Sequence, residues 1–178
     1  ATTSGPAAPY PSTINVSGII DPVVGVTVTL NGLTHTYPGD LDFLLVAPNG
    51  DKMIFLSDVG GTGDVSNITL TLDDGAAELP SSSQLVSGSF RPSNEGANDA
   101  FAGPAPAGPY GNATPAGTDT FASVFGGDDA NGNWSLYAVD DVGGDVGTLS
   151  GGWTIGILTQ DAVVCAPCTA TDLFSDGC

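Results

Sequence analysis

The feature that most constrains the fold is a series of short segments in which apolar and polar residues alternate. The clearest is "VGVTVTL" (24–30), whose apolar face comprises Val24, Val26, Val28 and Leu30. A period of two residues is typical of a β-strand with one buried face. The other segments with this pattern are 13–20, 67–72, 133–139 and 152–158. Residues that favour turns, mainly Gly, Pro, Asn and Asp, lie between them.

One segment departs from this pattern. "DFLLVA" (42–47) is apolar on both faces, which predicts a central strand that is covered on both sides. "PNGD" (48–51) follows it and predicts a tight turn. "KMIFLS" (52–57) is then expected to return as the second arm of a hairpin.

Many short strands without any helical periodicity indicate an all-β fold. We expect an antiparallel two-sheet jelly-roll β-sandwich with essentially no helix. The 178 residues suffice for one domain. We divide them into an N-terminal arm (1–12), a sandwich (13–160) and a Cys-bearing C-terminal tail (161–178). The sandwich contains a long Pro/Gly/Ala-rich loop (89–120), and such loops are usually functional, disordered or held by a partner.

The charge balance excludes several classes of partner. There are 20 acidic residues against Lys52 and Arg91, which gives a net charge of -18. Nucleic acid and anionic lipid should repel such a polyanion. No apolar run is long enough to span a membrane. The chain begins at Ala1, as cleavage at an A-x-A-type site would leave it, so we expect a mature secreted, extracellular protein.

His35 is the only histidine, and it is followed by acidic residues. A serine hydrolase needs a nucleophile, a base and an orienting acid, but no G-x-S-x-G motif is present. A cysteine enzyme would need His35 to meet a cysteine of the tail, and zinc chemistry would need more imidazoles. We therefore expect no enzyme, and we interpret His35 as a strand residue near a sheet edge.

Short Asp side chains in Gly-rich loops favour hard cations, and Ca²⁺ in particular, because it takes six to eight oxygen ligands. We predict calcium ligands in three groups of residues. The first group is Asp40 and Asp42, and the second is Asp58, Asp64, Asn67, Asp73 and Asp74. The third comprises Asp128, Asp129, Asn131, Asp140, Asp141 and Asp145. A predicted strand divides this third group, so its two halves should be separate sites at opposite ends of the sandwich.

The three cysteines, Cys165, Cys168 and Cys178, all lie in the C-terminal tail. A lone CxxC without a second pair or a nearby His is a weak zinc signal, so we expect a disulfide clip. Because three is an odd number, one thiol is left free or pairs with another chain.

Several motifs occur in a fixed order: "HTYPGDLDFLLVAPNG" (35–50), "GNWSLYAVDD" (132–141) and "GTLSGGWTI" (147–155). Together they resemble the P domain (P/Homo B domain) of proprotein convertases, and in particular its bacterial secreted form. The resemblance implies a non-catalytic jelly-roll sandwich that usually follows a subtilisin-like protease domain and stabilises it. It also implies that Asp40 is the acid after the first turn and that Asp140 is the acid closing the Trp strand. Some bacterial relatives bind Ca²⁺.

Two classes of function remain open. The first is a secreted calcium-binding structural or adhesive module that assembles with copies of itself, as a filament or surface-layer subunit. The second is an accessory domain that stabilises a secreted subtilisin-like protease. A weaker third alternative is glycan binding, for which the candidate aromatic residues are Tyr37, Tyr110 and Tyr137.

Overall fold

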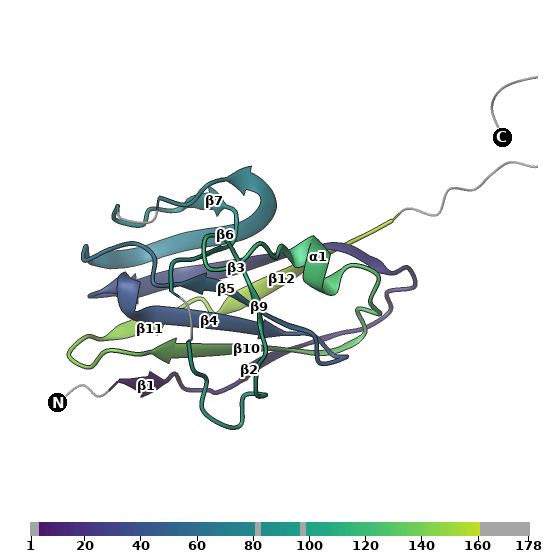
Figure 1. Cartoon of the computed structure of the whole chain (residues 1–178), viewed down its shortest axis with the longest axis horizontal. Coiled ribbons are helices and arrows are strands. Elements are labelled where there is room, and N and C mark those ends of the chain that lie inside the picture. The colour runs from purple at the N-terminus through teal and green to yellow at the C-terminus, as the bar shows by residue number, and fades with distance from the viewer. Residues whose placement is uncertain (1–3, 81–82, 97–98, 161–178) are drawn as a thin grey trace, which may run out of the picture.

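The computed structural model describes residues 4–80, 83–96 and 99–160, and they form two β-sheets that pack face to face (Figure 1). Sheet A consists of β1 (Gly5–Pro6), β2 (Ser12–Val16), β4 (Leu41–Val46), β5 (Lys52–Ser57), β8 (Ser93–Asn94), β9 (Gly111–Asn112) and β10 (Gly132–Asp140). Sheet B consists of β3 (Val23–His35), β6 (Val65–Ala77), β7 (Gly88–Phe90), β11 (Gly147–Leu149) and β12 (Trp153–Thr159). The all-β sandwich is confirmed, while its jelly-roll connectivity stays a prediction.

The central part of each sheet is antiparallel, as expected. In sheet A, β4 lies between β10 and β5, and the β4–β5 hairpin turns where "PNGD" predicts it. In sheet B, β3 pairs with β6 on one side and with β11 and β12 on the other. The prediction of purely antiparallel sheets is wrong at the margins, because β7, β8 and β9 pair in parallel. These short strands belong to loops that cross the sheets, so no hairpin turn fixes their direction.

Two irregularities in β3 decide which side chains it buries. Val24 was expected on the buried face, but it is 39% exposed and Val23 is buried instead. The cause is a register shift on β12, where Leu158 pairs with Gly25 and Thr159 pairs with Val23, so that Val24 is passed over. Farther along, the pairing of β3 with β6 shifts in register between Leu30 and Leu33, and β3 continues through this bulge.

Helix is limited to two short elements, in line with the expectation of essentially none. The 3₁₀ turn η1 (Pro38–Asp40) precedes β4, and the five-residue helix α1 (Phe121–Phe125) precedes β10. Asp74 on β6 accepts the N–H groups of Phe121 and Ala122 at 2.9 and 2.8 Å. Tertiary capping and the burial of two phenylalanines therefore hold α1, which is too short to show a helical period.

The main core lies between the two sheets. Its largest fully buried members include Trp134, Phe55, Phe121, Phe125, Leu30, Leu45, Leu70 and Leu72. Trp134 donates its indole N–H to the carbonyl of Ala130 at 2.9 Å, so burial leaves no donor unpaired.

A second, smaller core lies on the outer face of sheet A. It comprises Leu44, Ile54, Phe101, Tyr137 and Val139, with Tyr10 and Tyr110 at its margin. Phe101 and Tyr110 come from residues 99–117, which we call the covering loop; in Figure 1 part of it crosses in front of sheet A. The double apolar pattern of residues 42–47 thus has a structural cause, because β4 is covered by sheet B on one face and by the loop on the other.

The N-terminal segment that was expected as an arm lies along β10. β1 pairs with Val139 and Asp140, and β2 pairs with residues 132–136. The predicted disulfide clip at Cys165, Cys168 and Cys178 lies outside the described residues, as do residues 1–3. Among the described residues, no helix is both long and apolar enough to cross a membrane.

The covering loop should contribute measurably to stability. Phe101 is 9% exposed and contacts Tyr110 edge to face at 5.6 Å between ring centroids. Phe101→Ala is expected to lower the free energy of unfolding by about 3 kcal/mol through loss of buried surface and creation of a cavity. Val86→Ala, at a site that is 57% exposed, should change it by less than about 0.5 kcal/mol. Urea denaturation of both variants tests this, and equal effects would contradict a packed loop.

Candidate metal centre

Three aspartates from distant parts of the chain meet at one end of sheet A. Asp42 lies on β4, Asp58 directly follows β5, and Asp99 opens the covering loop. Each offers a carboxylate oxygen, and these three atoms lie within 4.8 Å of one another. Asp42 is 3% exposed, and Asp58 and Asp99 are partly buried.

The backbone explains why these side chains converge. Asp42 is the cross-strand partner of Ser57 in the β4–β5 hairpin, so Asp58 follows immediately beside it. Asp58 has a φ of 57°, a left-handed conformation that turns the chain at the end of β5. Gly96 brings the other segment close, since a Cβ there would overlap the Asp58 carboxylate and lie 3.2 Å from Asp99 Oδ1.

One hydroxyl group sits among the three carboxylates. Ser57 Oγ lies 2.7 Å from Asp42 Oδ1, 3.0 Å from Asp99 Oδ2 and 3.3 Å from Asp58 Oδ2. A hydroxyl carries one proton, so it can donate to only one of these acceptors at a time. The other carboxylates therefore face a neutral oxygen without a hydrogen bond from it.

No basic side chain offsets this negative charge within the described part of the chain. Arg91 forms an exposed ion pair with Glu78 at 3.2 Å. Lys52 begins β5, whereas the cluster lies at the opposite end of that strand. Neither residue is placed to neutralise the three aspartates.

Burial and mutual repulsion disfavour the charged forms of Asp42 and Asp58, so the pKa values of these two residues are raised. Burial raises the pKa of Asp42 to about 7; the hydrogen bond from Ser57 opposes this rise, and the charges of Asp99 and Asp58 add to it. Burial and the charge of Asp99 likewise raise the pKa of Asp58. Asp141 directly follows β10 at the same end of sheet A. Burial, followed by the charge of Asp99, also raises the pKa of Asp141.

A further oxygen at the site lacks a partner. The Asn94 side chain is fully buried, and its Nδ2 donates to Asn112 Oδ1 at 3.1 Å and lies 3.5 Å from Asp99 Oδ2. Its Oδ1 is buried with no hydrogen-bond partner. An unpaired buried oxygen costs free energy unless a donor or a cation satisfies it.

These residues fit a hard divalent cation. The donors are carboxylate, amide and hydroxyl oxygens, which suit Ca²⁺ or Mg²⁺ better than zinc or copper. Oxygens on opposite sides of a calcium ion lie about 4.6–5.2 Å apart, and the spacing of the triad is compatible with this. Asp42, Asp58 and Asp99 would hold the ion, and Ser57 Oγ is a neutral oxygen that lies among them.

The remaining predicted ligands at this end form a second layer around the site. Asp40 is 7% exposed, and its carbonyl accepts the N–H of Asp141 at 3.0 Å. Burial and the charges of Asp141, Asp145 and Asp140 raise the pKa of Asp40 to about 6. Asp145 accepts a hydrogen bond from Thr36 Oγ1 at 2.9 Å.

His35 is buried at the same end, at 2% exposure. Its Nδ1 accepts the N–H of Tyr37 at 3.1 Å, so its proton is on Nε2, which lies 3.4 Å from Asp140 Oδ2. Both ring nitrogens are thus engaged. His35 was expected near a sheet edge; it ends the central strand β3 and pairs with Gly147 on β11.

The other predicted ligands do not join the triad. Asp74 caps α1, and Asp73 accepts the N–H of Gly75 at 2.8 Å. Asp64 and Asn67 are exposed, and Asn67 donates its backbone N–H to Thr34.

Asp128, Asp129 and Asn131 lie at the start of β10, at the opposite end from Asp140, as the sequence predicts. Asn131 Nδ2 donates to Asp129 at 2.6 Å and to the carbonyl of Ile19 at 2.7 Å, so these two side chains fasten a loop. Asp128 Oδ2 is buried without a partner, and burial raises the pKa of Asp128.

Asp99 is the residue that sequence reasoning missed. It lies in the long loop, where no strand pattern indicates which residues approach which sheet. The segment "NEGAND" (94–99) carries acids, amides and a glycine, the same composition as the three predicted groups of calcium ligands. This composition is the one feature of the sequence that could have pointed to Asp99.

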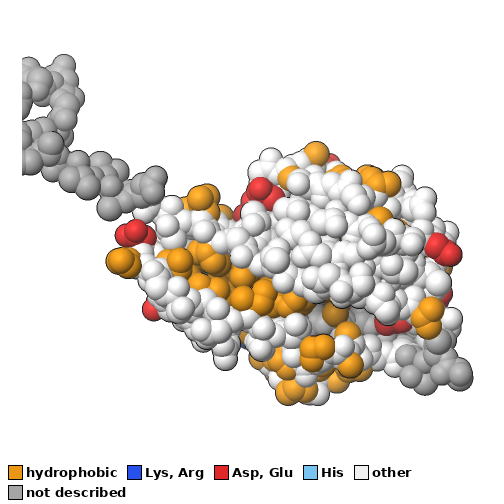
Figure 2. All heavy atoms as spheres, turned by 180° about the vertical axis from the view of Figure 1, so that it is seen from behind, with side chains coloured by type: hydrophobic (Ala, Val, Ile, Leu, Met, Phe, Trp, Pro, Cys, Tyr) orange, Lys and Arg blue, Asp and Glu red, His pale blue; other side chains and the backbone are white. Residues whose placement is uncertain are grey.

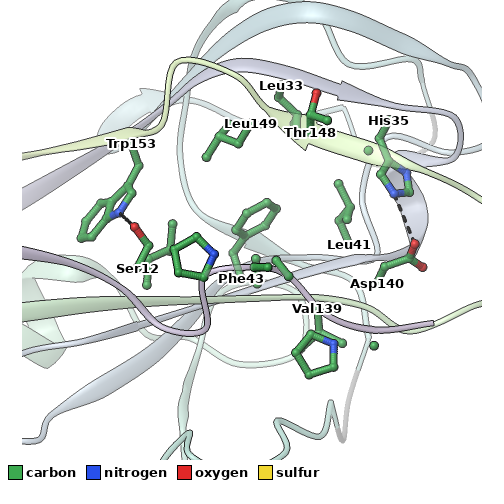
Figure 3. A pocket seen from close by; sticks show the side chains of 18 of the residues that line it. Ser12, Leu33, His35, Leu41, Phe43, Val139, Asp140, Thr148, Leu149 and Trp153 are labelled. Carbon is green, nitrogen blue, oxygen red and sulfur yellow. Dashed lines mark hydrogen bonds and ion pairs between the residues drawn. The ribbon is translucent and has the colours of Figure 1, made fainter. Parts of the chain in front are cut away.

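A separate cavity of about 590 Å³ opens between the sheets near β1 and β11 (Figure 3). Leu33, Leu41, Phe43, Leu149 and Trp153 line it, with His35 and Asp140 at one end. At the other end Trp153 Nε1 donates to Ser12 Oγ at 3.0 Å. Of the three tyrosines considered for glycans, Tyr137 is buried under the covering loop, at 7% exposure.

No protein-family model, curated protein or solved structure matches the chain. The resemblance to the P domain therefore stays a prediction, and the site must be interpreted from its own geometry.

The stability of the metal-free protein should fall as pH rises. The folded-state pKa of Asp42 is about 7, raised from 3.8. Between these two values the folded state binds more protons than the unfolded state, so this stabilising contribution is present below pH 4 and is lost by about pH 7. Calcium requires the deprotonated form, so the stabilisation by Ca²⁺ should grow over the same range.

Melting temperatures at about pH 5, 6, 7 and 8, in EDTA and in Ca²⁺, test this expectation. Asp42→Asn is the control, because it removes one of the titrating groups and should weaken both trends. A calcium shift of equal size at pH 5 and pH 8 would contradict the assignment.

Proposed function

We propose that the protein is a non-catalytic, calcium-binding β-sandwich that serves as an extracellular structural or adhesive module and assembles with copies of itself. The observation that carries the proposal is the convergence of Asp42, Asp58 and Asp99 around Ser57 without a neutralising cation from the protein. In this function Ca²⁺ ties the covering loop to the end of sheet A.

The donor set favours calcium over magnesium. Mg²⁺ demands near-octahedral geometry at about 2.0–2.1 Å and keeps several waters, whereas Ca²⁺ accepts irregular sets of carboxylates, amides and carbonyls. The triad combines an irregular backbone at Asp58 with the unpartnered amide oxygen of Asn94. That irregularity suits the larger ion.

An extracellular setting agrees with this choice. Calcium sites of extracellular modules bind with dissociation constants of about 10⁻⁴–10⁻³ M, which only the concentrations outside cells can saturate. A three-carboxylate site, at which protons compete through the raised pKa of Asp42, belongs in this range. The net charge of -18 also favours a setting rich in divalent cations.

The state of the only histidine supports a non-catalytic role. His35 is buried, its Nδ1 accepts a backbone N–H, and its Nε2 faces Asp140. A general base needs a free nitrogen within reach of a nucleophile. His35 instead joins β3 to the end of β10.

One observation favours the alternative, an accessory domain of a secreted subtilisin-like protease. The motif residues behind the P-domain resemblance meet in one corner, where His35 pairs with Asp140 and Asp40 binds the backbone of Asp141. A subtilisin-like domain encoded ahead of Ala1 would favour this role, and the calcium site would serve either function.

Calcium removal and three variants test the site. At a free Ca²⁺ concentration of about 100 times Kd, the ion adds about 2.7 kcal/mol of stability. For a domain of this size that corresponds to about 5–10 °C, which EDTA should remove. Asp42→Asn, Asp58→Asn and Asp99→Asn should each reduce calcium affinity by at least about tenfold.

Asp42→Asn has a second, opposite effect that separates a metal site from a merely structural cluster. In EDTA this variant should melt at or above the wild-type temperature, because it relieves burial of a charge. Exposed Asp64→Asn is the matched control and should bind calcium as the wild type does. Titration calorimetry and melting curves measure both effects, and no binding of Ca²⁺ by the wild type would refute the site.

A further inference from the structure

One side of the sandwich carries no formal charge along both of its sheet edges. Residues 4–20 contain β1 and β2 at the edge of sheet A, and residues 146–160 contain β11 and β12 at the edge of sheet B. Neither segment holds an Asp, Glu, Lys or Arg, although the chain has 20 acids. We call the surface formed by these two segments the neutral edge.

Hydrophobic side chains follow this edge. Figure 2 shows them in a stripe across the face opposite to that of Figure 1, with acidic side chains toward the margins. Partly buried side chains from both segments contact the main core, namely Ile14, Val16, Ile19, Ile155 and Ile157. Leu158 is 64% exposed and Ile20 is 94% exposed.

The sheet A side and the sheet B side of the neutral edge differ in how well they are protected. On the sheet A side, the segment that holds β1 and β2 carries Pro6, Pro9 and Pro11, which lack N–H donors and discourage further pairing. β12 has seven residues, no proline and no charge. Among the described residues it pairs with β3 alone, so alternate N–H and C=O groups of β12 point away from the sheet.

We infer that β12 pairs with β12 of a second copy of this chain, so that sheet B continues across a two-fold dimer. This inference rests on the self-assembly in the proposed function and names its surface. Two copies with a charge of -18 each repel one another, and the neutral edge is where strands can approach without bringing like charges together.

Antiparallel self-pairing suits the sequence of β12. A two-fold axis between the two copies of β12 makes the contact isologous, so "WTIGILT" faces its own reverse. Its exposed positions are Thr154, Gly156 and Leu158, and the β-branched Thr154 and the apolar Leu158 would lie opposite one another in such a pair, which stabilises it. Half-buried Ile155 and Ile157 extend the apolar contact toward the stripe.

Sedimentation of the full chain under reducing conditions and in Ca²⁺ tests the inference. The wild type should be a dimer whose affinity increases between about 20 and 500 mM NaCl, because salt screens the repulsion between copies. Leu158→Asp, which adds one like charge per copy at the contact, should weaken dimerisation by at least about tenfold. Val86→Asp, at a site 57% exposed on another part of the surface, is the matched control and should dimerise as the wild type does.

The outcomes separate this surface from the calcium site. At concentrations at which both proteins are monomeric, Leu158→Asp should keep the wild-type melting temperature and calcium affinity, so loss of dimer at higher concentration reports on the edge alone. A wild type that stays monomeric at high salt, or equal dimerisation of Leu158→Asp and Val86→Asp, would overturn the inference. Dimerisation only when the chain is ended at Gln160 would overturn it as well, since the chain's own tail would then occupy the edge.

Discussion

Sheet A is apolar on both faces, and the rest of the structure depends on covering both of them. Sheet B covers one face through Phe43 and Leu45 of β4. The other face presents Leu44 and Ile54, and among the described residues the covering loop and Tyr10 pack against it. Burial of apolar area drives this arrangement, at about 25 cal/mol per Å². A loop whose one strand, β9, has two residues thus becomes a third layer of the fold.

The candidate metal centre follows from this third layer. The covering loop must begin close to the end of β5, and Asn94, Gly96 and Asp99 place its start against Asp42 and Asp58. Packing brings the carboxylates together, while their charges oppose that packing. The proposed calcium ion would reconcile the two effects, because it would turn the repulsion into a crosslink between loop and sheet. The ion would then hold the start of the covering loop, and the apolar side chains of the loop would hold the rest of it against sheet A.

Period-two patterns predicted most of the strands, because burial on one face leaves a direct trace in the sequence. The sequence also predicted β4, from its apolar residues on both faces, and the turn that follows it. The register of β3 was not, since the bulge opposite Thr159 buries Val23 in place of Val24 and depends on the partner strand. Helix α1 also escaped prediction, because its five residues are too few to show a helical period.

The site was half predictable. Asp42 lies on β4 and Asp58 directly follows β5, two strands whose pairing could be inferred, and hairpin geometry brings the two residues together. Asp99 could not be placed, since the path of a loop is set by side-chain contacts made far along the sequence. Asp74, Asp129 and Asn131 had the composition of ligands but satisfy backbone groups and each other. Residue type alone does not distinguish a cap from a ligand.

The pairing of early strands with late ones has a consequence for how the chain acquires its structure. β2 binds β10 and β3 binds β12, so each sheet is closed by residues from the last part of the sandwich. Such long-range pairing makes folding slow, because distant segments must meet before their contacts stabilise anything. A nascent chain that ends before residue 132 would expose β4 and β3 along unpaired edges, which invite aggregation. The molecule should therefore become protected against misassociation only once synthesis of the sandwich is complete.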